Sequence, residues 1–409
     1  MKKLSVRLKN VLVITIMTLA LQTACEAKKK YPKGIKHVVV IGLDGMSSTG
    51  FHAATTPCMD SLIGHGAVNY AVRSVLPTVS TPNWNAMLCG AGPEITGANS
   101  NSWKANDLDF PSVAISKDRS FPNIFRILRM QKPDAELGAI YHWGGFSAML
   151  EKSILNVSVH CSKQLETAQK SAEYIIEKKP TFLFIQLDGI DGAGHNSGHM
   201  SPDYIKYIGE TDTHVRIIVD AIHKAGIAGS TMIMVVSDHG GIFGGHGGNS
   251  YDELVTPIIF SGKGIKQNYR IRQQIYRYDV AADVAFALGV TAPQLWTGRP
   301  TQAAYIGFDE PDNLWEEMEV LPSPRFAAKD NNHKAAFGGE FTGKATVTII
   351  APEGTKGVIR YTTDGTTPTA TSTVYSTPFT VDTTTVVNAK LFNEKGESVK
   401  VSATYKITE

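Results

Sequence analysis

Unbroken apolar runs alternate with helix-like segments between residues 37 and 288, which predicts strands and helices in turn along the chain. An apolar run without polar interruptions is typical of a parallel strand that is covered on both faces. The predicted strands lie at 37–43, 67–76, 137–142, 181–187, 232–236 and 256–261. The predicted helices lie at 56–64, 121–131, 165–178, 202–225 and 279–288. This order predicts a doubly wound, mostly parallel α/β sheet.

The pattern changes after residue 312, where the helix-like segments stop. Pro322, Pro324 and a polar run at 329–333 indicate a linker, and Thr-rich alternation such as VIRYTTDGTTP then predicts a small antiparallel β-sandwich. The expected parts are a signal segment at 1–27, a catalytic α/β domain at 28–312, a linker at 313–330 and an accessory β domain at 331–409. The accessory domain has no cluster of candidate catalytic residues, so it either serves as a spacer or glycan-contacting module or only packs.

The first residues have the build of a secretory signal. Four basic residues precede the apolar run 11–21, which is too short to span a bilayer comfortably. Cys25 lies where a bacterial lipoprotein signal places its lipidated cysteine. We therefore expect an exported protein at the periplasm or cell surface, anchored through a lipid on Cys25. Cleavage near Ala27 without a lipid is the alternative.

Composition narrows the classes of function. The 409 residues are 42% hydrophobic and 19% charged, which excludes general disorder, and a formal net charge of +2 gives no support to nucleic-acid binding. Beyond Cys25 the chain has three cysteines, at 58, 89 and 161, without a CxxC spacing, so a thiolate metal site is not expected. Cys89 is expected in the core, and a disulfide between Cys58 and Cys161 stays open.

Acidic residues and histidines gather where three of the predicted strands end. In open α/β sheets, ligands bind beyond the carboxyl ends of the strands, so these side chains are expected to converge. They are Asp44, Asp191, His195, Asp238, His239 and His246. Carboxylates and imidazoles in this number suit zinc.

Asp191 and His195 are separated by glycines and are expected to bind a metal from a loop. The HxxxH spacing of His195 and His199 is that of a zinc-protease helix. Because no Glu follows His195 and Gly198 disfavours a helix, we reject that interpretation.

Ser80 lies in PTVSTPNW (77–84), where Pro82 suits the first turn of a helix. A helix N-terminus favours an anion through its free N–H groups and its dipole, and a hydroxyl beside a metal is activated as a nucleophile. Ser80 is therefore a candidate nucleophile. The alternative is a serine that only caps the helix.

Together these motifs resemble the alkaline phosphatase superfamily, and over about residues 36–308 the nearest branch is the type I phosphodiesterase/nucleotide pyrophosphatase family. The resemblance implies two Zn²⁺ ions, one held by Asp191, His195 and His246. It assigns to the other ion the ligands Asp44, Ser80, Asp238 and His239. It also implies that Asn83 binds a phosphoryl oxygen and that Trp84 and Trp143 belong to the substrate pocket. The C-terminal part resembles the small β domain of chitobiases and hexosaminidases.

Some residues depart from the family pattern. Ser80 stands where Thr is usual, Trp84 stands where His is frequent, and the GGHGG around His246 is closer to the ethanolamine-phosphate transferases of the superfamily. We expect a zinc-dependent phosphodiesterase or nucleotide pyrophosphatase with a phosphoseryl intermediate at Ser80. Its substrate would be a small phosphate ester or an envelope phosphodiester, and nucleotides would enter only as substrates.

Other functions are kept as alternatives. A phosphomonoesterase or a phosphoethanolamine transferase would use the same metal pair. A sulfatase is less well supported, because Trp84 stands where its motif requires Arg and His239 replaces the Asn that suits a single calcium. A surface lipoprotein that binds glycans without catalysis is the non-enzymatic alternative.

Overall fold

The computed structural model describes residues 31–105, 110–115, 121–242, 244–312, 314, 321, 323–326, 338–351 and 356–409. The predicted signal segment with Cys25, and most of the predicted linker, lie outside these residues. In the part of the chain that is described, no helix is both long and apolar enough to cross a membrane.

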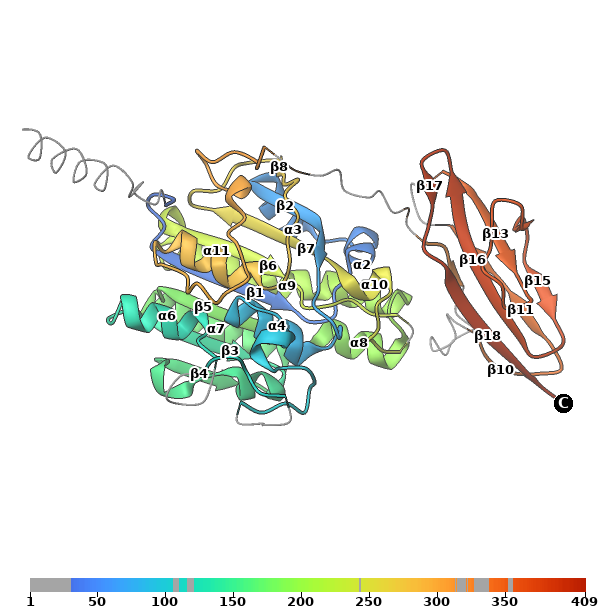
Figure 1. Cartoon of the computed structure of the whole chain (residues 1–409), viewed down its shortest axis with the longest axis horizontal. Helices are drawn as coiled ribbons and strands as arrows, with labels where there is room; N and C mark the ends of the chain where they lie inside the picture. Colours follow the sequence, from blue (N-terminus) through green and yellow to red (C-terminus); the bar gives the residue numbers. More distant parts are fainter. Residues whose placement is uncertain are drawn as a thin grey trace, which may run out of the picture.

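Within the described residues, eight strands form one sheet in the order β4-β3-β5-β1-β6-β7-β2-β8 (Figure 1). The strands are β1 (His37–Leu43), β2 (Gly66–Arg73), β3 (Leu137–Tyr141), β4 (Val157–His160), β5 (Phe182–Leu187), β6 (Thr231–Val236), β7 (Val255–Gly262) and β8 (Tyr269–Arg270). Only β7 runs against the others, pairing antiparallel with β6 and β2. The predicted mostly parallel α/β sheet is confirmed.

Helices cover both faces of this sheet, which explains its unbroken apolar strands (Figure 1). In β1, Val38 and Val40 join the core under one helix layer, while Val39 and Ile41 join the core under the other. The first layer contains α4 (Ser80–Cys89), α6 (Ile124–Gln131) and α11 (Asp279–Ala287). The second contains α2 (Ser48–Ala53), α3 (Pro57–Gly64), α7 (Gln164–Lys178), α8 (Gly189–Ser197) and α9 (Pro202–Lys224). Shorter helices are α5 (Pro93–Thr96), α10 (Tyr251–Leu254), η1 (Gly144–Met149), η2 (Lys152–Ile154), η3 (Ala228–Ser230) and η4 (Gln302–Ala304).

The C-terminal strands have a hydrophobic core of their own, centred on residues such as Val347, Val387 and Leu391. A main sheet has the order β10-β18-β16-β13-β14 with β17 beside β16, and β11–β15 and β12–β9 form two further pairs. Pairing is antiparallel except between β10 and β18. The bounds are β9 (Arg325–Phe326), β10 (Gly338–Thr342), β11 (Ala345–Val347), β12 (Ile349–Ile350), β13 (Val358–Thr362), β14 (Thr373–Val374), β15 (Phe379–Val381), β16 (Thr385–Asn393), β17 (Gly396–Glu397) and β18 (Val401–Thr408).

The three cysteines after Cys25 are all buried and free. Cys89 lies on α4 in the core, as expected, and Cys58 is not bonded to Cys161. Burial raises the pKa of the Cys58 thiol to about 11 and raises the pKa of Cys89 as well. These thiols therefore have little thiolate character at neutral pH.

Candidate metal centre and nucleophile

The carboxyl ends of three adjacent parallel strands bring the candidate ligands together. β1 lies between β5 and β6, so the residues after these strands meet at one edge of the sheet. Asp44 follows β1, Asp238 and His239 follow β6, and α8 starts directly after β5. The structure therefore brings together the acids and histidines that the strand ends predicted.

Asp191 and His195 lie on the short helix α8, and the prediction of a loop was wrong. Their spacing of four residues places them on one helix face, with Asp191 Oδ2 3.1 Å from His195 Nε2. The helix ends at Ser197, and Gly198 adopts a φ of 93°, which favours glycine. His199 therefore lies outside the helix, as the glycine predicted.

His195 and His246 face each other with their Nε2 atoms. His195 Nδ1 lies 2.8 Å from the carbonyl oxygen of Gly244, and His246 Nδ1 lies 2.9 Å from that of Thr78, so each Nδ1 donates its N–H. The two Nε2 atoms, both lone-pair acceptors, are only 3.2 Å apart. Such a contact requires a cation or a proton between them. The hydrogen bond to Asp191 raises the pKa of His195 to about 9, so a proton is favoured there in the metal-free chain.

The second group surrounds His239 Nε2. That atom lies 3.2 Å from Asp238 Oδ2, 3.6 Å from Asp44 Oδ1 and 3.3 Å from Ser80 Oγ. His239 Nδ1 lies 2.8 Å from the carbonyl oxygen of Gly240, to which it donates, and this directs the Nε2 lone pair toward the group. Burial raises the pKa values of Asp44 and Asp238 well above their usual range and lowers the pKa of His239 to about 3.

Within the described residues, three buried carboxylate oxygens of this centre have no hydrogen-bond partner: Asp44 Oδ1, Asp191 Oδ1 and Asp238 Oδ2. The other oxygens of Asp44 and Asp238 are held, since Asp44 Oδ2 accepts from Trp84 and Gln186 and Asp238 Oδ1 accepts from the Gly45 amide. Each buried acceptor without a partner costs about 1–3 kcal/mol. Divalent cations would satisfy all three oxygens, so these residues fit a metal centre.

Two groups of described residues have ligand atoms within 4.8 Å of one another: Asp44, Asp238 and His239, and Asp191, His239 and His246. The first agrees with one predicted ligand set. The second replaces the predicted His195 by His239, whose ring stacks on His246 with centroids 3.8 Å apart. Because His195 Nε2 also lies close to Asp191 and His246, we keep His195 in the candidate set.

Ser80 is the first residue of α4, at the N-terminus where it was predicted. The N-cap is Val79, whose side chain makes no capping hydrogen bond, so Ser80 is not the cap. The Thr81 N–H donates to Asn101 Oδ1, the Asn83 N–H donates to the Val79 carbonyl, and Pro82 has no N–H. The Ser80 N–H and the helix dipole are therefore what favour an anion beside the Ser80 hydroxyl.

Asn83 is fully buried, and its amide is committed to the backbone. Its Oδ1 accepts from the Val75 N–H at 2.7 Å, and its Nδ2 donates to the carbonyl oxygens of Val75, Pro77 and Val79. These contacts do not favour the predicted contact with a phosphoryl oxygen. Asn83 instead fixes the loop that presents Ser80.

Asn101 was not predicted as a site residue, but its side chain contacts the first turn of α4. Its Oδ1 accepts from the Thr81 N–H at 2.8 Å, next to Ser80, and its side chain is exposed. Among the described residues its Nδ2 has no partner. Asn101 lies in a loop without a periodic pattern, so only the fold reveals its closeness to Ser80.

Trp84 is fully buried, so its ring is not exposed to a substrate as predicted. Its ring lies against Gly42, where an added Cβ would come within 2.6 Å, and its Nε1 donates to Asp44 Oδ2 at 3.0 Å. Trp143 is half-buried, and its backbone N–H donates to Gln186 Oε1 at 2.8 Å. Its role at the substrate stays a prediction.

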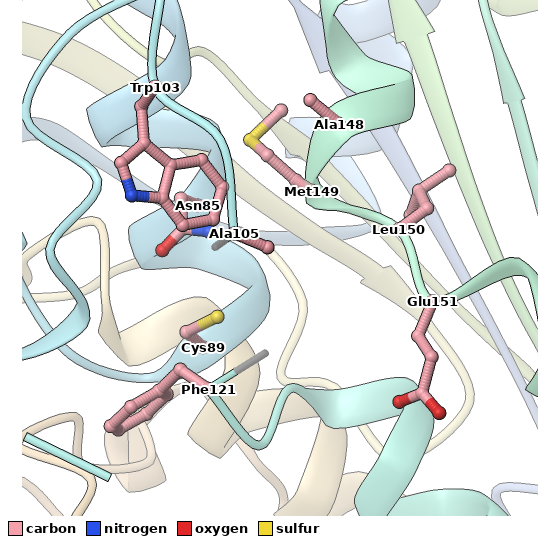
Figure 2. A pocket seen from close by; sticks show the side chains of 9 residues that line it. All are labelled: Asn85, Cys89, Trp103, Ala105, Phe121, Ala148, Met149, Leu150 and Glu151. Carbon is pink, nitrogen blue, oxygen red and sulfur yellow. The ribbon is translucent and has the colours of Figure 1, made fainter. Parts of the chain in front are cut away.

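A cavity of about 90 Å³ lies beside α4 (Figure 2). Asn85 and Cys89, one turn apart on the helix, form part of its wall, and Trp103 and Phe121 form an aromatic part. Asn85 Oδ1 is buried there without a partner. The space suits a few water molecules or a small organic group.

The sequence of this chain matches two known protein families. Residues 38–244 match the model of the type I phosphodiesterase / nucleotide pyrophosphatase family, and residues 337–405 match the chitobiase/beta-hexosaminidase C-terminal domain. The GPI ethanolamine phosphate transferase 1 of Yarrowia lipolytica is 26% identical over 232 residues, covering 54% of this chain and 25% of the relative. Ectonucleotide pyrophosphatase/phosphodiesterase family member 1 of Mus musculus is 21% identical over 213 residues, covering 49% and 24%. The chain thus spans about a quarter of the length of these relatives.

Among solved structures, an inactive variant of murine ectonucleotide pyrophosphatase / phosphodiesterase 5 in complex with AMP has the same fold. Its TM-score is 0.53 at 15% identity, covering 63% of this chain and 96% of that chain. The family match spans more than half of the 409 residues. The chain therefore belongs to the type I phosphodiesterase / nucleotide pyrophosphatase family.

Proposed function

We propose that this protein is a zinc-dependent phosphodiesterase that acts through a phosphoseryl intermediate on Ser80. The observation that supports this most directly is the group of unpaired, buried carboxylate oxygens beside the Ser80 hydroxyl at a helix N-terminus. Asp191, His195 and His246 would hold one zinc ion. Asp44, Asp238, His239 and Ser80 would hold the other.

When bound, two zinc ions would neutralise phosphoryl charge and favour the ionised Ser80 hydroxyl. Ser80 Oγ attacks phosphorus, a P–O bond to Ser80 forms, and the bond to the leaving oxygen breaks. Water then cleaves the phosphoseryl ester and restores the hydroxyl. The Ser80 N–H and the Asn101 amide nitrogen would bind the phosphoryl oxygens, because the Thr81 N–H already donates to Asn101 Oδ1.

A diester is favoured as substrate because the family match is to phosphodiesterases and nucleotide pyrophosphatases. Ethanolamine phosphate transferases are also relatives, which supports a second candidate: transfer of the phosphoryl group from Ser80 to an alcohol. Both reactions share the attack by Ser80. They differ in whether water or another hydroxyl completes the cycle.

The test is the rate of the signal-free protein, supplied with zinc, on an aryl phosphodiester and on the matching monoester. Faster cleavage of the diester, lost with a chelator and restored by zinc, is expected. Faster cleavage of the monoester would make the protein a phosphatase and overturn the diesterase assignment. The diester is also cleaved in the presence of an added amino alcohol. If the phosphoryl group is then found on the amino alcohol and less hydrolysis product forms, the result would support the transferase.

We further propose export and a lipid anchor at Cys25, on the basis of the N-terminal sequence. The C-terminal domain would contact glycans, as its family match suggests. Radiolabelled palmitate incorporated by the full chain, but not by its Cys25→Ser variant, would support the anchor. Equal labelling of both would exclude it.

A further inference from the structure

His199 is a buried histidine that the proposed mechanism does not use. Its side chain has no exposed surface, and neither ring nitrogen has a hydrogen-bond partner in the part of the chain that the structure describes. The ring lies between two glycines: a Cβ on Gly194 would come within 2.5 Å of it, and one on Gly241 within 2.3 Å. Both glycines lie beside residues of the metal centre. The backbone around the centre thus leaves room for this ring.

The other three histidines of the centre differ from His199 in one respect. His195, His239 and His246 each donate Nδ1–H to a backbone carbonyl, which leaves Nε2 as an acceptor. They therefore have no N–H to offer a carboxylate when they are neutral. Among the described residues, no carbonyl accepts from either nitrogen of His199, so its N–H can lie on Nε2.

His199 Nε2 lies 3.6 Å from Asp191 Oδ1, slightly beyond hydrogen-bond distance. That oxygen is itself buried and has no partner. His199 Nε2 can therefore act as a donor that still needs an acceptor, and Asp191 Oδ1 beside it is an acceptor that still needs a donor. A small shift of the Asp191 carboxylate would satisfy both atoms.

We propose that His199 is a positioning residue that donates Nε2–H to the Asp191 carboxylate and orients Asp191 as a zinc ligand. The inference rests on the proposed metal binding. Groups that donate hydrogen bonds to metal ligands typically change metal affinity 10- to 100-fold when they are lost. In the metal-free protein the two ring nitrogens of His199 are unpaired, so they do not stabilise the fold through hydrogen bonds. The proposed role of His199 is therefore distinct from stabilising the fold.

The test compares three variants of the signal-free protein. His199→Phe keeps a ring between the two glycines but removes the donor, His199→Gln keeps an N–H donor, and His199→Leu removes the donor without a ring. Zinc affinity is measured by competition with a chromophoric chelator, and thermal stability is measured without metal. No substrate is needed for either readout.

We expect His199→Phe to weaken zinc binding about 10- to 100-fold. Its metal-free melting temperature should not fall, because two unpaired buried nitrogens are removed. His199→Gln should retain most of the affinity. If Phe does not fit the site, His199→Leu takes its place in the comparison.

Wild-type zinc affinity in a folded Phe or Leu variant would overturn the role of His199 while leaving the proposed function intact. A variant that loses metal-free stability but binds zinc normally would show a purely structural role and would also overturn it. If the wild type does not bind zinc, the proposed function is refuted, and the role of His199 that rests on it is refuted as well.

Discussion

Replacing Trp84 by Phe tests whether the hydrogen bond from Trp84 Nε1 to Asp44 organises the metal centre. The bond is 3.0 Å long, and both partners are fully buried. Phe would keep an aromatic ring near Phe146 and Phe184 but would lack the outer indole atoms, Cη2 and Cζ3, that lie against Gly42. The variant therefore removes the N–H donor and part of the buried ring, and the second loss needs a control.

A hydrogen bond to a charged group contributes about 1.5–3 kcal/mol, and 1.4 kcal/mol corresponds to a tenfold change in affinity. Asp44 Oδ2 would still accept from Gln186 Nε2, at 2.9 Å, so we take the lower end of this range. The expected loss of zinc affinity in Trp84→Phe is about tenfold. Competition with a chelator, or calorimetry, measures it directly.

Trp296→Phe is the matched control. Trp296 is also buried, and its Nε1 donates to the Pro122 carbonyl at 2.9 Å, away from the candidate ligands. Both variants lose a ring N–H and should lose metal-free stability, but only Trp84→Phe should weaken zinc binding. Equal zinc affinity in Trp84→Phe and Trp296→Phe would refute the reasoning.

Three further predictions address other parts of the molecule. Ser80→Ala should abolish turnover and leave the zinc content largely intact, as rate measurements and metal analysis would show. Unchanged turnover would exclude Ser80 as the nucleophile. Burial raises the pKa of Asp279 from 3.8 to about 6, so the stability that its protonated form contributes at low pH is lost as pH rises through 6. In the wild type this effect should lower the free energy of unfolding by about 3 kcal/mol between pH 3 and 7, and Asp279→Asn should abolish this decrease. An Asp279→Asn variant whose free energy of unfolding depends on pH as in the wild type would contradict the prediction. A thiol reagent should label none of the three buried cysteines in the native signal-free protein and all three after unfolding. Fewer than three labelled cysteines in the unfolded, unreduced protein would indicate a disulfide.

Much of the fold could be predicted because its signals are local. The apolar run 37–43 coincides with β1, and the acids directly after β1 and β6 take part in the centre because parallel strands end at one edge. Pro82 likewise indicated the helix that starts at Ser80. The mostly parallel order follows from these patterns.

The errors have physical reasons. Glycines within 189–197 have low helix propensity, but packing against α9 outweighs it, so Asp191 lies on a helix. The resemblance suggested that Asn83 and Trp84 face the substrate. Whether a polar side chain faces a ligand or its own backbone depends on contacts distant in sequence, such as the one between Trp84 and Asp44.

The predicted metal ligands come from segments spread between residues 44 and 246, and His246 is fixed by the carbonyl of Thr78 from another segment. Bound zinc would therefore act as a long-range cross-link that an unfolded chain cannot form. Ligand binding of this kind adds about 4 kcal/mol of stability when free metal is a thousandfold above its dissociation constant. Zinc scarcity would thus leave more of the protein transiently open to proteases, so the metal supply would set how long each molecule survives as well as how fast it works.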